Sequence, residues 1–132
     1  MKFLIDTNIA IHARDGFEPV LDRLARHEGV MFLSALSLAE LQRGLCAGGL
    51  DSALRQTRLK RILQTVPVLA FDAAAAETYG QIIAQIGWTC RKDFDRLIGA
   101  HALAAGCTLV TANTSDFSDI PGLSLEDWTL SA

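Results

Sequence analysis

Short apolar segments alternate with longer helical stretches along this chain of 132 residues, and that alternation limits the fold more than any other feature of the sequence. Apolar runs bounded by turn residues predict short buried strands. They cover residues 2–5, 30–33, 66–69 and 108–111, and a further edge strand is expected at 123–125. Apolar strands separated by helices indicate an α/β fold with a mainly parallel sheet of four to five strands, covered by helices on both faces.

The helical stretches are marked by the residues that begin and end them. Asp72 is expected to cap a helix over 73–86, and the Gly48-Gly49 pair separates a helix that begins at Ser34 from a charged helix over 51–64. Further helices are predicted after Asp6-Thr7-Asn8, over 17–27, and from Asp95 to Gly106. Half of the residues are hydrophobic, which at this length supplies one core, so we predict a single domain over residues 1–132.

Charge and cysteine content restrict the classes of function. A formal net charge of -3 argues against a broadly basic nucleic-acid-binding surface, although a local basic patch or a bound cation could still hold a phosphate substrate. Cys46, Cys90 and Cys107 are widely spaced and predict neither a disulfide framework nor a zinc site. With no signal peptide and no apolar stretch of membrane-spanning length, we expect a cytoplasmic protein without membrane association.

Four acidic residues occupy related places in this pattern. Asp6 follows the first strand, Glu40 lies in the helix after the second, Asp95 opens a helix, and Asp116 follows the strand at 108–111. The carboxyl ends of parallel strands share one edge of a sheet, where α/β proteins form their binding sites. We therefore expect the four carboxylates to converge there, where they would repel one another unless cations lay between them.

Each acid also has a purely structural explanation. Asp6 can cap the helix that follows it, and Glu40 stands three residues after Ser37, the spacing of a capping box, although a helix start at Ser34 would weaken that interpretation. The helix macrodipole favours an aspartate such as Asp95 near a helix N-terminus. Asp116 fits an ordinary turn.

The donor set predicts the chemistry. Oxygen ligands without histidine or cysteine favour Mg²⁺ or Mn²⁺ over zinc. Such an ion lowers the pKa of an attacking water and offsets the charge that grows on a phosphorane and its leaving oxygen. The predicted reaction is hydrolysis of a phosphodiester, with one metal ion as the minimum and two as the alternative.

A set of short motifs runs through nearly the whole chain in a fixed order. The motifs are Leu4-Ile5-Asp6-Thr7-Asn8, the stretch from Ser34 through Glu40-Leu41 to Gly44, Phe94-Asp95-Arg96-Leu97-Ile98 with Ala100-His101-Ala102, residues 108–114 with Asp116-Phe117, and Ile120-Pro121-Gly122-Leu123 with Trp128. Each is common by itself, but their order and spacing are specific. Together they resemble PIN-domain proteins, in particular the VapC-type toxins of prokaryotic toxin–antitoxin pairs.

The resemblance implies a three-layer α/β/α fold and an endoribonuclease that depends on magnesium or manganese. It places the acidic ligands on Asp6, Glu40, Asp95 and Asp116. It also implies a cognate antitoxin as partner, frequent homodimers, and cleavage at one defined site in an RNA that the sequence does not name.

Polar residues beside the acids are candidates for orienting them or contacting the substrate. Asn8 and Thr111 match family positions with those roles, and Asn113 lies in the same T-x-N motif; hydrogen bonding within loops is the alternative for all three. Arg91 and Lys92 depart from the family pattern, which more often has small or neutral residues before the third acid. By position they are candidates for binding RNA phosphates.

Two further residues near the third acid need an assignment. Asp93 is an alternative to Asp95 as a ligand, but it lies two residues earlier and points to a different side of the helix, so we expect it to cap that helix. His101 shares a helical face with Leu97 and Ala105, which predicts a packed core histidine rather than a catalytic base.

Other charged and apolar groups have less specific interpretations. Arg43 lies one turn from Glu40 and could tune it, and no base-stacking platform of exposed aromatic residues is evident. The densest basic cluster is expected to form a solvated helix face, with RNA binding as the alternative; it comprises Arg55, Arg58, Lys60 and Arg61. Three leucines of one helix either contact another chain or belong to the core; they are Leu38, Leu41 and Leu45.

Two other functions are compatible with an α/β sheet that carries acids at its strand ends. A phospho-acceptor signalling domain would need paired acids after the first strand and a lysine near the end, whereas no lysine follows Lys92. A catalytically silent PIN domain would act as a binding module, and the presence of all four acids argues against it.

Overall fold

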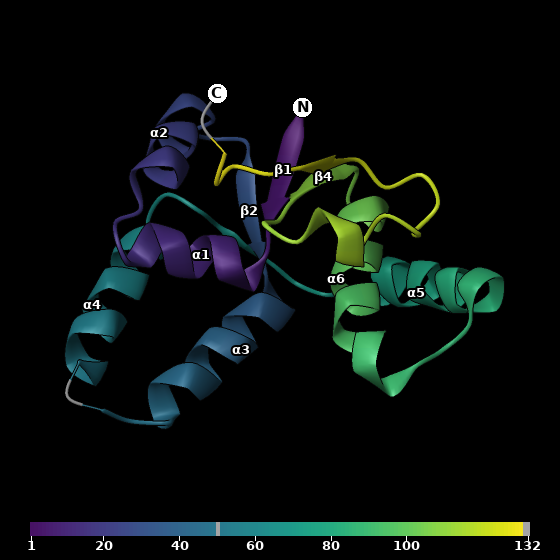
Figure 1. Cartoon of the computed structure of the whole chain (residues 1–132), viewed down its shortest axis with the longest axis horizontal. Helices are drawn as coiled ribbons and strands as arrows, with labels where there is room; N and C mark the ends of the chain where they lie inside the picture. The colour runs from purple at the N-terminus through teal and green to yellow at the C-terminus, as the bar shows by residue number, and fades with distance from the viewer. Residues whose placement is uncertain (50, 131–132) are drawn as a thin grey trace.

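The computed structural model describes residues 1–49 and 51–130 and contains a five-stranded sheet with helices on both faces (Figure 1). The strand order is β3-β2-β1-β4-β5, and each neighbouring pair is parallel. The strands are β1 (Lys2–Ile5), β2 (Met31–Ser34), β3 (Val68–Leu69), β4 (Cys107–Val110) and β5 (Leu125–Glu126). The predicted α/β class with a parallel sheet is confirmed.

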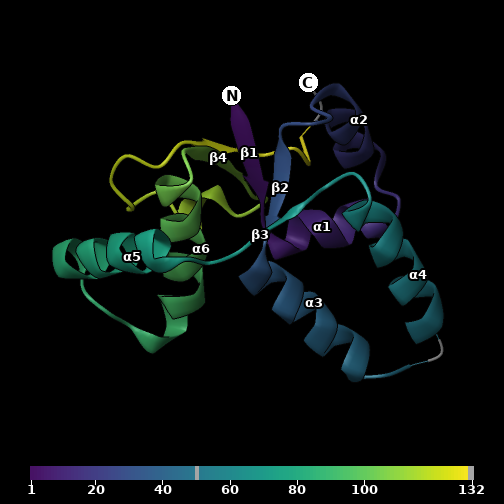
Figure 2. The same ribbon diagram turned by 180° about the vertical axis from the view of Figure 1, so that it is seen from behind.

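Helices connect successive strands in the described part of the chain. They are α1 (Thr7–Arg14), α2 (Glu18–Arg26), α3 (Ala35–Cys46), α4 (Ser52–Leu63), α5 (Ala73–Ile86) and α6 (Asp93–Ala104), with short 3-10 turns η1 (Cys90–Lys92) and η2 (Thr114–Asp116). Figures 1 and 2 show α1 to α4 on one side of the sheet and α5 with α6 on the other, which is the predicted three-layer α/β/α arrangement. None of the described helices is long and apolar enough to cross a membrane.

Element boundaries differ from the prediction where local backbone chemistry intervenes. The third strand has two residues rather than four; before it, Pro67 has no N–H to donate, and its carbonyl accepts the Leu33 N–H at 2.9 Å. The fifth strand starts later because Leu123 still belongs to the turn at Gly122, where φ is +79°. As predicted, Asp72 caps α5, with its side chain accepting from the Ala75 N–H at 2.9 Å.

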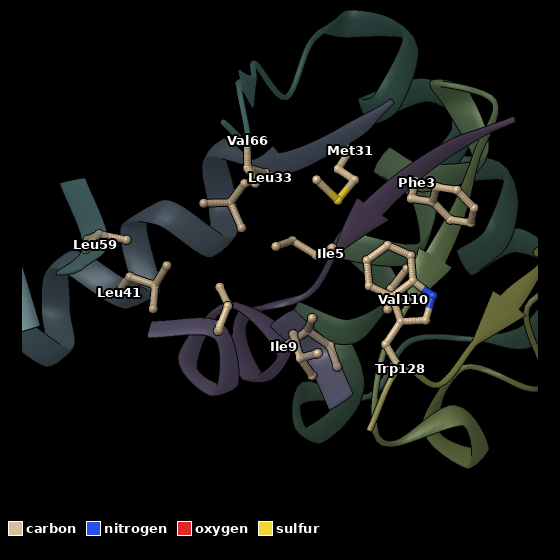
Figure 3. Packing of buried hydrophobic residues seen from close by; sticks show 13 residues of the cluster. Phe3, Ile5, Ile9, Met31, Leu33, Leu41, Leu59, Val66, Val110 and Trp128 are labelled. Atoms are coloured by element: carbon tan, nitrogen blue, oxygen red, sulfur yellow. The ribbon is translucent and has the colours of Figure 1, made fainter. Parts of the chain in front are cut away.

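Side chains of the central strands β2, β1 and β4 alternate between two hydrophobic cores, as strand geometry requires. In β1, Phe3 and Ile5 enter the first core, shared with α1 to α4, whereas Leu4 enters the second, shared with α5 and α6. Figure 3 shows the first core, which Trp128 closes from the C-terminal end of the chain. Fully burying an aliphatic side chain such as Ile5 stabilises the fold by roughly 1.5–3 kcal/mol. Both faces of the sheet are therefore fixed by packing.

The path of the chain creates a crevice at the carboxyl edge of the sheet. From β1 it builds β2 and β3 on one side and then returns to form β4 on the other, so the direction of winding switches between β1 and β4. The two strand ends are joined by a hydrogen bond from the Asp6 N–H to the Val110 carbonyl at 3.0 Å. Asp6 and the segment that carries Asp116 therefore leave the sheet side by side.

Candidate acidic active site

A cavity of about 290 Å³ opens at this edge of the sheet, and all four predicted acids line it. Asp6 comes from the end of β1, Glu40 from α3, Asp95 from the first turn of α6, and Asp116 from η2. Asn8 and Asn113 line the same cavity. Segments far apart in sequence thus place four carboxylates around one space.

Asp6 has both of the roles that the sequence left open. It is the N-cap of α1, and its Oδ1 accepts the Ile9 N–H at 2.9 Å. Burial raises the pKa of the Asp6 carboxyl; hydrogen bonds from the Thr111 side chain and the Ile9 N–H oppose the rise, and the charge of Glu40 adds to it. Because the Thr111 hydroxyl also accepts the Asn113 N–H at 3.0 Å, this threonine joins Asp6 to the loop after β4.

The capping-box interpretation of Glu40 is wrong. Helix α3 begins at Ala35, and its N-cap is Ser34, whose Oγ accepts the Leu36 N–H at 3.1 Å. Ser37 is therefore the third residue of the helix rather than its N-cap, so Glu40 does not stand at the capping-box spacing from the residue that begins α3. Glu40 lies on the second turn and is free to point into the cavity.

Two neighbours hold the Glu40 carboxylate. The Thr7 hydroxyl donates to Oε1 at 2.5 Å, and Arg43 lies 3.5 Å from Oε2. Arg43 was predicted as a neighbour, but Thr7 was missed. The one indication of this contact in the sequence was that Thr7 directly follows Asp6, which places Thr7 at the start of α1, opposite α3.

Asp95 shows how strongly the acids affect one another. Burial raises the pKa of the Asp95 carboxyl, and the charges of Asp116, Asp6 and Glu40 raise it further, in that order, while Arg96 lowers it. Like charges at close range favour the protonated form. The cavity therefore concentrates negative charge that only a proton or a bound cation can balance.

An ion pair between buried Arg96 and exposed Asp119 joins the two segments that carry Asp95 and Asp116. Arg96 is only 5% exposed, and its guanidinium donates to both oxygens of Asp119, at 2.6 and 2.8 Å. This pair joins α6 to the loop that follows η2 and holds the pKa of the Asp119 carboxyl below its usual range. No local pattern in the sequence indicates this pair, because its two residues lie 23 positions apart.

Asp93 does not cap α6, contrary to the prediction. Lys92 occupies the N-cap position, and no side-chain hydrogen bond caps this helix. The Asp93 carboxylate instead accepts a hydrogen bond from the Tyr79 hydroxyl, and Asp93 does not line the acidic cavity. The geometry thus separates Asp93 from Asp95, as their two-residue offset predicted.

His101 is a core residue, as predicted. It is 3% exposed, and its Nδ1 lies 2.8 Å from the Ser34 Oγ. Burial lowers the pKa of the imidazole, which favours the neutral form. The three leucines of α3 also pack in or against the first core rather than forming a separate apolar face.

The basic residues divide into two groups. Arg91 and Lys92 line a second cavity of about 660 Å³ that Asp95 and Asp116 also line, so they lie beside the acids. Arg58 and Arg61 of α4 line a different cavity, with residues of α1 and α2 and without any of the four acids. Position therefore favours Arg91 and Lys92 as the cations that serve the acidic site.

The four carboxylates fit a hard divalent cation by their chemistry. They offer oxygen donors only, and the pKa of Asp95 is raised first by burial and then by the charges of the other three acids, a repulsion that a cation would relieve. Within the residues described, no three His, Cys, Asp or Glu side chains are close enough to form a ready-made metal centre. Binding an ion would require the carboxylates to turn toward one another.

Comparison with known proteins agrees with this combination of parallel sheet and acidic cavity. The family model described as "PIN domain" matches residues 3–123. A tRNA(fMet)-specific endonuclease VapC of Shigella flexneri is 35% identical over 98% of this chain and 99% of its own. Ribonuclease VapC2 of Rickettsia felis is 33% identical over 97% and 98% of the two chains.

A solved structure gives the same result in three dimensions. A chain of VapBC2 from Rickettsia felis, solved bound to a DNA fragment from the promoter, matches with a TM-score of 0.85 and 30% identity over 97% of this chain and 99% of that one. The fold and the acidic cavity together thus define an α/β/α protein with acidic residues near the carboxyl ends of its parallel strands. The chain belongs to the PIN-domain family, and within it to the VapC group.

Proposed function

We propose that this protein is a divalent-metal-dependent endoribonuclease and the toxin of a toxin–antitoxin pair. The observation that carries the proposal is the cavity lined by Asp6, Glu40, Asp95 and Asp116 in a chain of the VapC group. Relatives over the full length of the chain are named as ribonucleases, and a similar chain was solved within a VapBC assembly. The reaction assigned to the cavity is hydrolysis of an RNA phosphodiester bond.

The four carboxylates are the proposed metal ligands and catalytic groups. Mg²⁺, or alternatively Mn²⁺, supplies a water of lowered pKa and positive charge beside the phosphate when it is bound. The chain orients the ligands: the Ile9 N–H and Thr111 hold Asp6, and Thr7 and Arg43 hold Glu40. Asn8 and Asn113 line the cavity and are proposed to orient an acid or contact the cut phosphate.

The proposed partners follow from the same relatives. RNA is the substrate, and a cognate antitoxin would cover the toxin, as the VapBC assembly suggests. We also propose that the chain acts as a single domain in the cytoplasm and that it forms a homodimer. The RNA sequence that is cut is left to experiment.

Cleavage of total cellular RNA by the purified, antitoxin-free chain tests the proposal. Incubations with Mg²⁺, with Mn²⁺ and with EDTA are compared, and Asp95→Asn controls for a contaminating nuclease. Discrete cuts that need the metal and disappear in the variant are expected, and sequencing the new ends identifies the target.

Two outcomes would overturn the proposal. No cutting by a folded chain in any lane would favour the silent binding module. A trapped aspartyl-phosphate after incubation with a phosphodonor and Mg²⁺ would favour the phospho-acceptor domain.

A further inference from the structure

The acidic cavity continues into a second one whose far wall is the segment of residues 86–92. The second cavity, of about 660 Å³, shares Asp95 and Asp116 with the first. Its other wall carries Arg91 and Lys92 and the backbone around Gly87, where α5 ends with a φ of +82°. A polymer with its phosphate at the acids therefore has an open path along this segment.

The two cations on this path are available to a ligand. Arg91 is exposed and Lys92 half-buried, and neither forms an ion pair with an acid of the described chain. The third cation of the cavity, Arg96, is already engaged by both oxygens of Asp119. Unpaired cations next to a concentration of carboxylates suit a ligand whose negative charges are spaced along a chain.

Trp88 lies between two residues that line the same cavity, Gly87 and Thr89. Its side chain is 58% exposed, whereas Trp128 is fully buried. Trp88 is close enough to Tyr79 to affect the pKa of its hydroxyl, and that hydroxyl donates a hydrogen bond to Asp93 at the start of α6. An aromatic ring that faces water can stack with a base. The structure thus contains the exposed aromatic residue that the sequence did not reveal.

We propose that Trp88, Arg91 and Lys92 form a nucleotide subsite for single-stranded RNA beside the acidic cavity. Trp88 stacks on a base adjoining the cut bond, and Arg91 with Lys92 binds the neighbouring phosphates. The subsite rests on the proposed ribonuclease function and extends it, because it assigns how the strand enters the acidic cavity.

Binding of two labelled hexamers separates stacking from charge. One probe is fluorescein-labelled hexaadenylate, and the other is a ribose-phosphate hexamer without bases. Anisotropy is measured with Ca²⁺ in place of Mg²⁺, and gels check that the oligomers stay intact. Trp88→Ala should weaken hexaadenylate binding about tenfold and leave the abasic probe unchanged, whereas Trp88→Phe should retain most of the affinity.

Replacing Arg91 and Lys92 should change probe binding in a different way from replacing Trp88. The double variant Arg91→Gln/Lys92→Gln should weaken both probes and reduce the slope of log K against log salt by about 1.4, the value for two phosphate contacts on a single strand. The matched control is Arg58→Gln/Lys60→Gln, which removes the same charge from exposed positions of α4. This control should leave both affinities and the slope unchanged.

Three results would overturn the subsite. They are unchanged hexaadenylate binding by Trp88→Ala, an equally large effect of the α4 control, and no binding of either probe by the wild-type chain. Cleavage of cellular RNA distinguishes this failure from failure of the ribonuclease proposal. If wild type and Trp88→Ala cut equally well with Mg²⁺, only the subsite is rejected; if the wild type does not cut at all, the proposed function is rejected as well.

Discussion

Helix α6 carries polar side chains in two contrasting environments. Arg96 and His101 are buried with partners, Asp119 and Ser34 respectively, so their polar atoms are satisfied. Asp95, on the same helix, instead has its pKa raised by burial and, beyond that, by the charges of three other acids. The polar groups of α6 that fix the fold thus have partners, whereas Asp95, which lines the cavity, is placed among like charges.

The contrast has an energetic meaning. A buried polar group with a partner contributes to stability or costs little, whereas clustered carboxylates destabilise the fold at neutral pH unless something binds them. Asp95 should therefore be dispensable for folding and essential for activity, whereas Asp6 also caps α1 and contributes to both. The paired residues Arg96 and His101 should matter mainly for folding.

The largest expected effect is on the rate of cleavage. Asp95→Asn should lower the cleavage rate by at least about a hundredfold, because it removes one proposed metal ligand. Replacing a residue that only orients a ligand already lowers activity about 10- to 100-fold. In EDTA at pH 7 the free energy of unfolding should rise slightly, because a repelled charge is lost. Initial rates and urea unfolding measure the two effects.

Asp93→Asn is the matched control for this substitution, since Asp93 lies two residues away and outside the acidic cavity. It keeps an acceptor for Tyr79 and should cut at nearly the wild-type rate. A rate loss as large as that of Asp95→Asn would mean that the two environments are not distinct.

The next effect concerns a residue that orients an acid. Thr7→Val keeps the shape of the side chain but removes the hydroxyl that donates to Glu40, so the cleavage rate should fall about 10- to 100-fold. Thr7→Ser retains the hydroxyl and should restore most of the rate. Equal activity of the two variants in the cleavage assay would show that this hydrogen bond is not needed.

Replacing either residue of the Arg96–Asp119 ion pair should lower the free energy of unfolding, but by different amounts. Asp119→Asn leaves the buried Arg96 guanidinium without its carboxylate and should lower the free energy of unfolding by about 2 kcal/mol. Arg96→Met fills the same space without a charge and should cost less. Urea unfolding compares the two variants, and the reverse order would contradict the view that this pair mainly satisfies Arg96.

The smallest effect is a pH dependence. The pKa of His101 is lowered by burial, with the charge of Asp72 opposing, so the unfolded chain binds more protons than the folded chain below about pH 6.5. The stability that this histidine contributes is present above that pH and is lost as the pH falls through its folded pKa. Between pH 7 and 5 the wild type should therefore lose more stability than His101→Asn, as followed by thermal unfolding. Parallel curves would exclude a neutral buried imidazole.

Much of the fold was predictable because it depends on local chemistry. The first strand, the Asp72 cap and the helix over 73–86 lie where the sequence placed them, since apolar runs, capping side chains and glycines act within a few residues. The third and fifth strands were less well placed, because edge strands pair over short lengths and adjacent turns set their limits.

The candidate site was predictable in its members but not in its contacts. The positions of the four acids after strands and in helices, together with the motifs that resemble the PIN family, pointed to one cavity before any geometry was known. The contacts of Thr7 with Glu40 and of Arg96 with Asp119 join residues 33 and 23 positions apart, and nothing local marks them.

The sequence by itself therefore determined the order of strands and helices, the acids at the sheet edge and the family to which the chain belongs. Only the tertiary structure shows that Asp93 turns to Tyr79, that the buried Arg96 pairs with Asp119, and that Trp88 is exposed between two residues that line the second cavity. The physical reason is that secondary structure follows from neighbours along the chain, whereas the partner and burial of a side chain depend on which distant element packs against it.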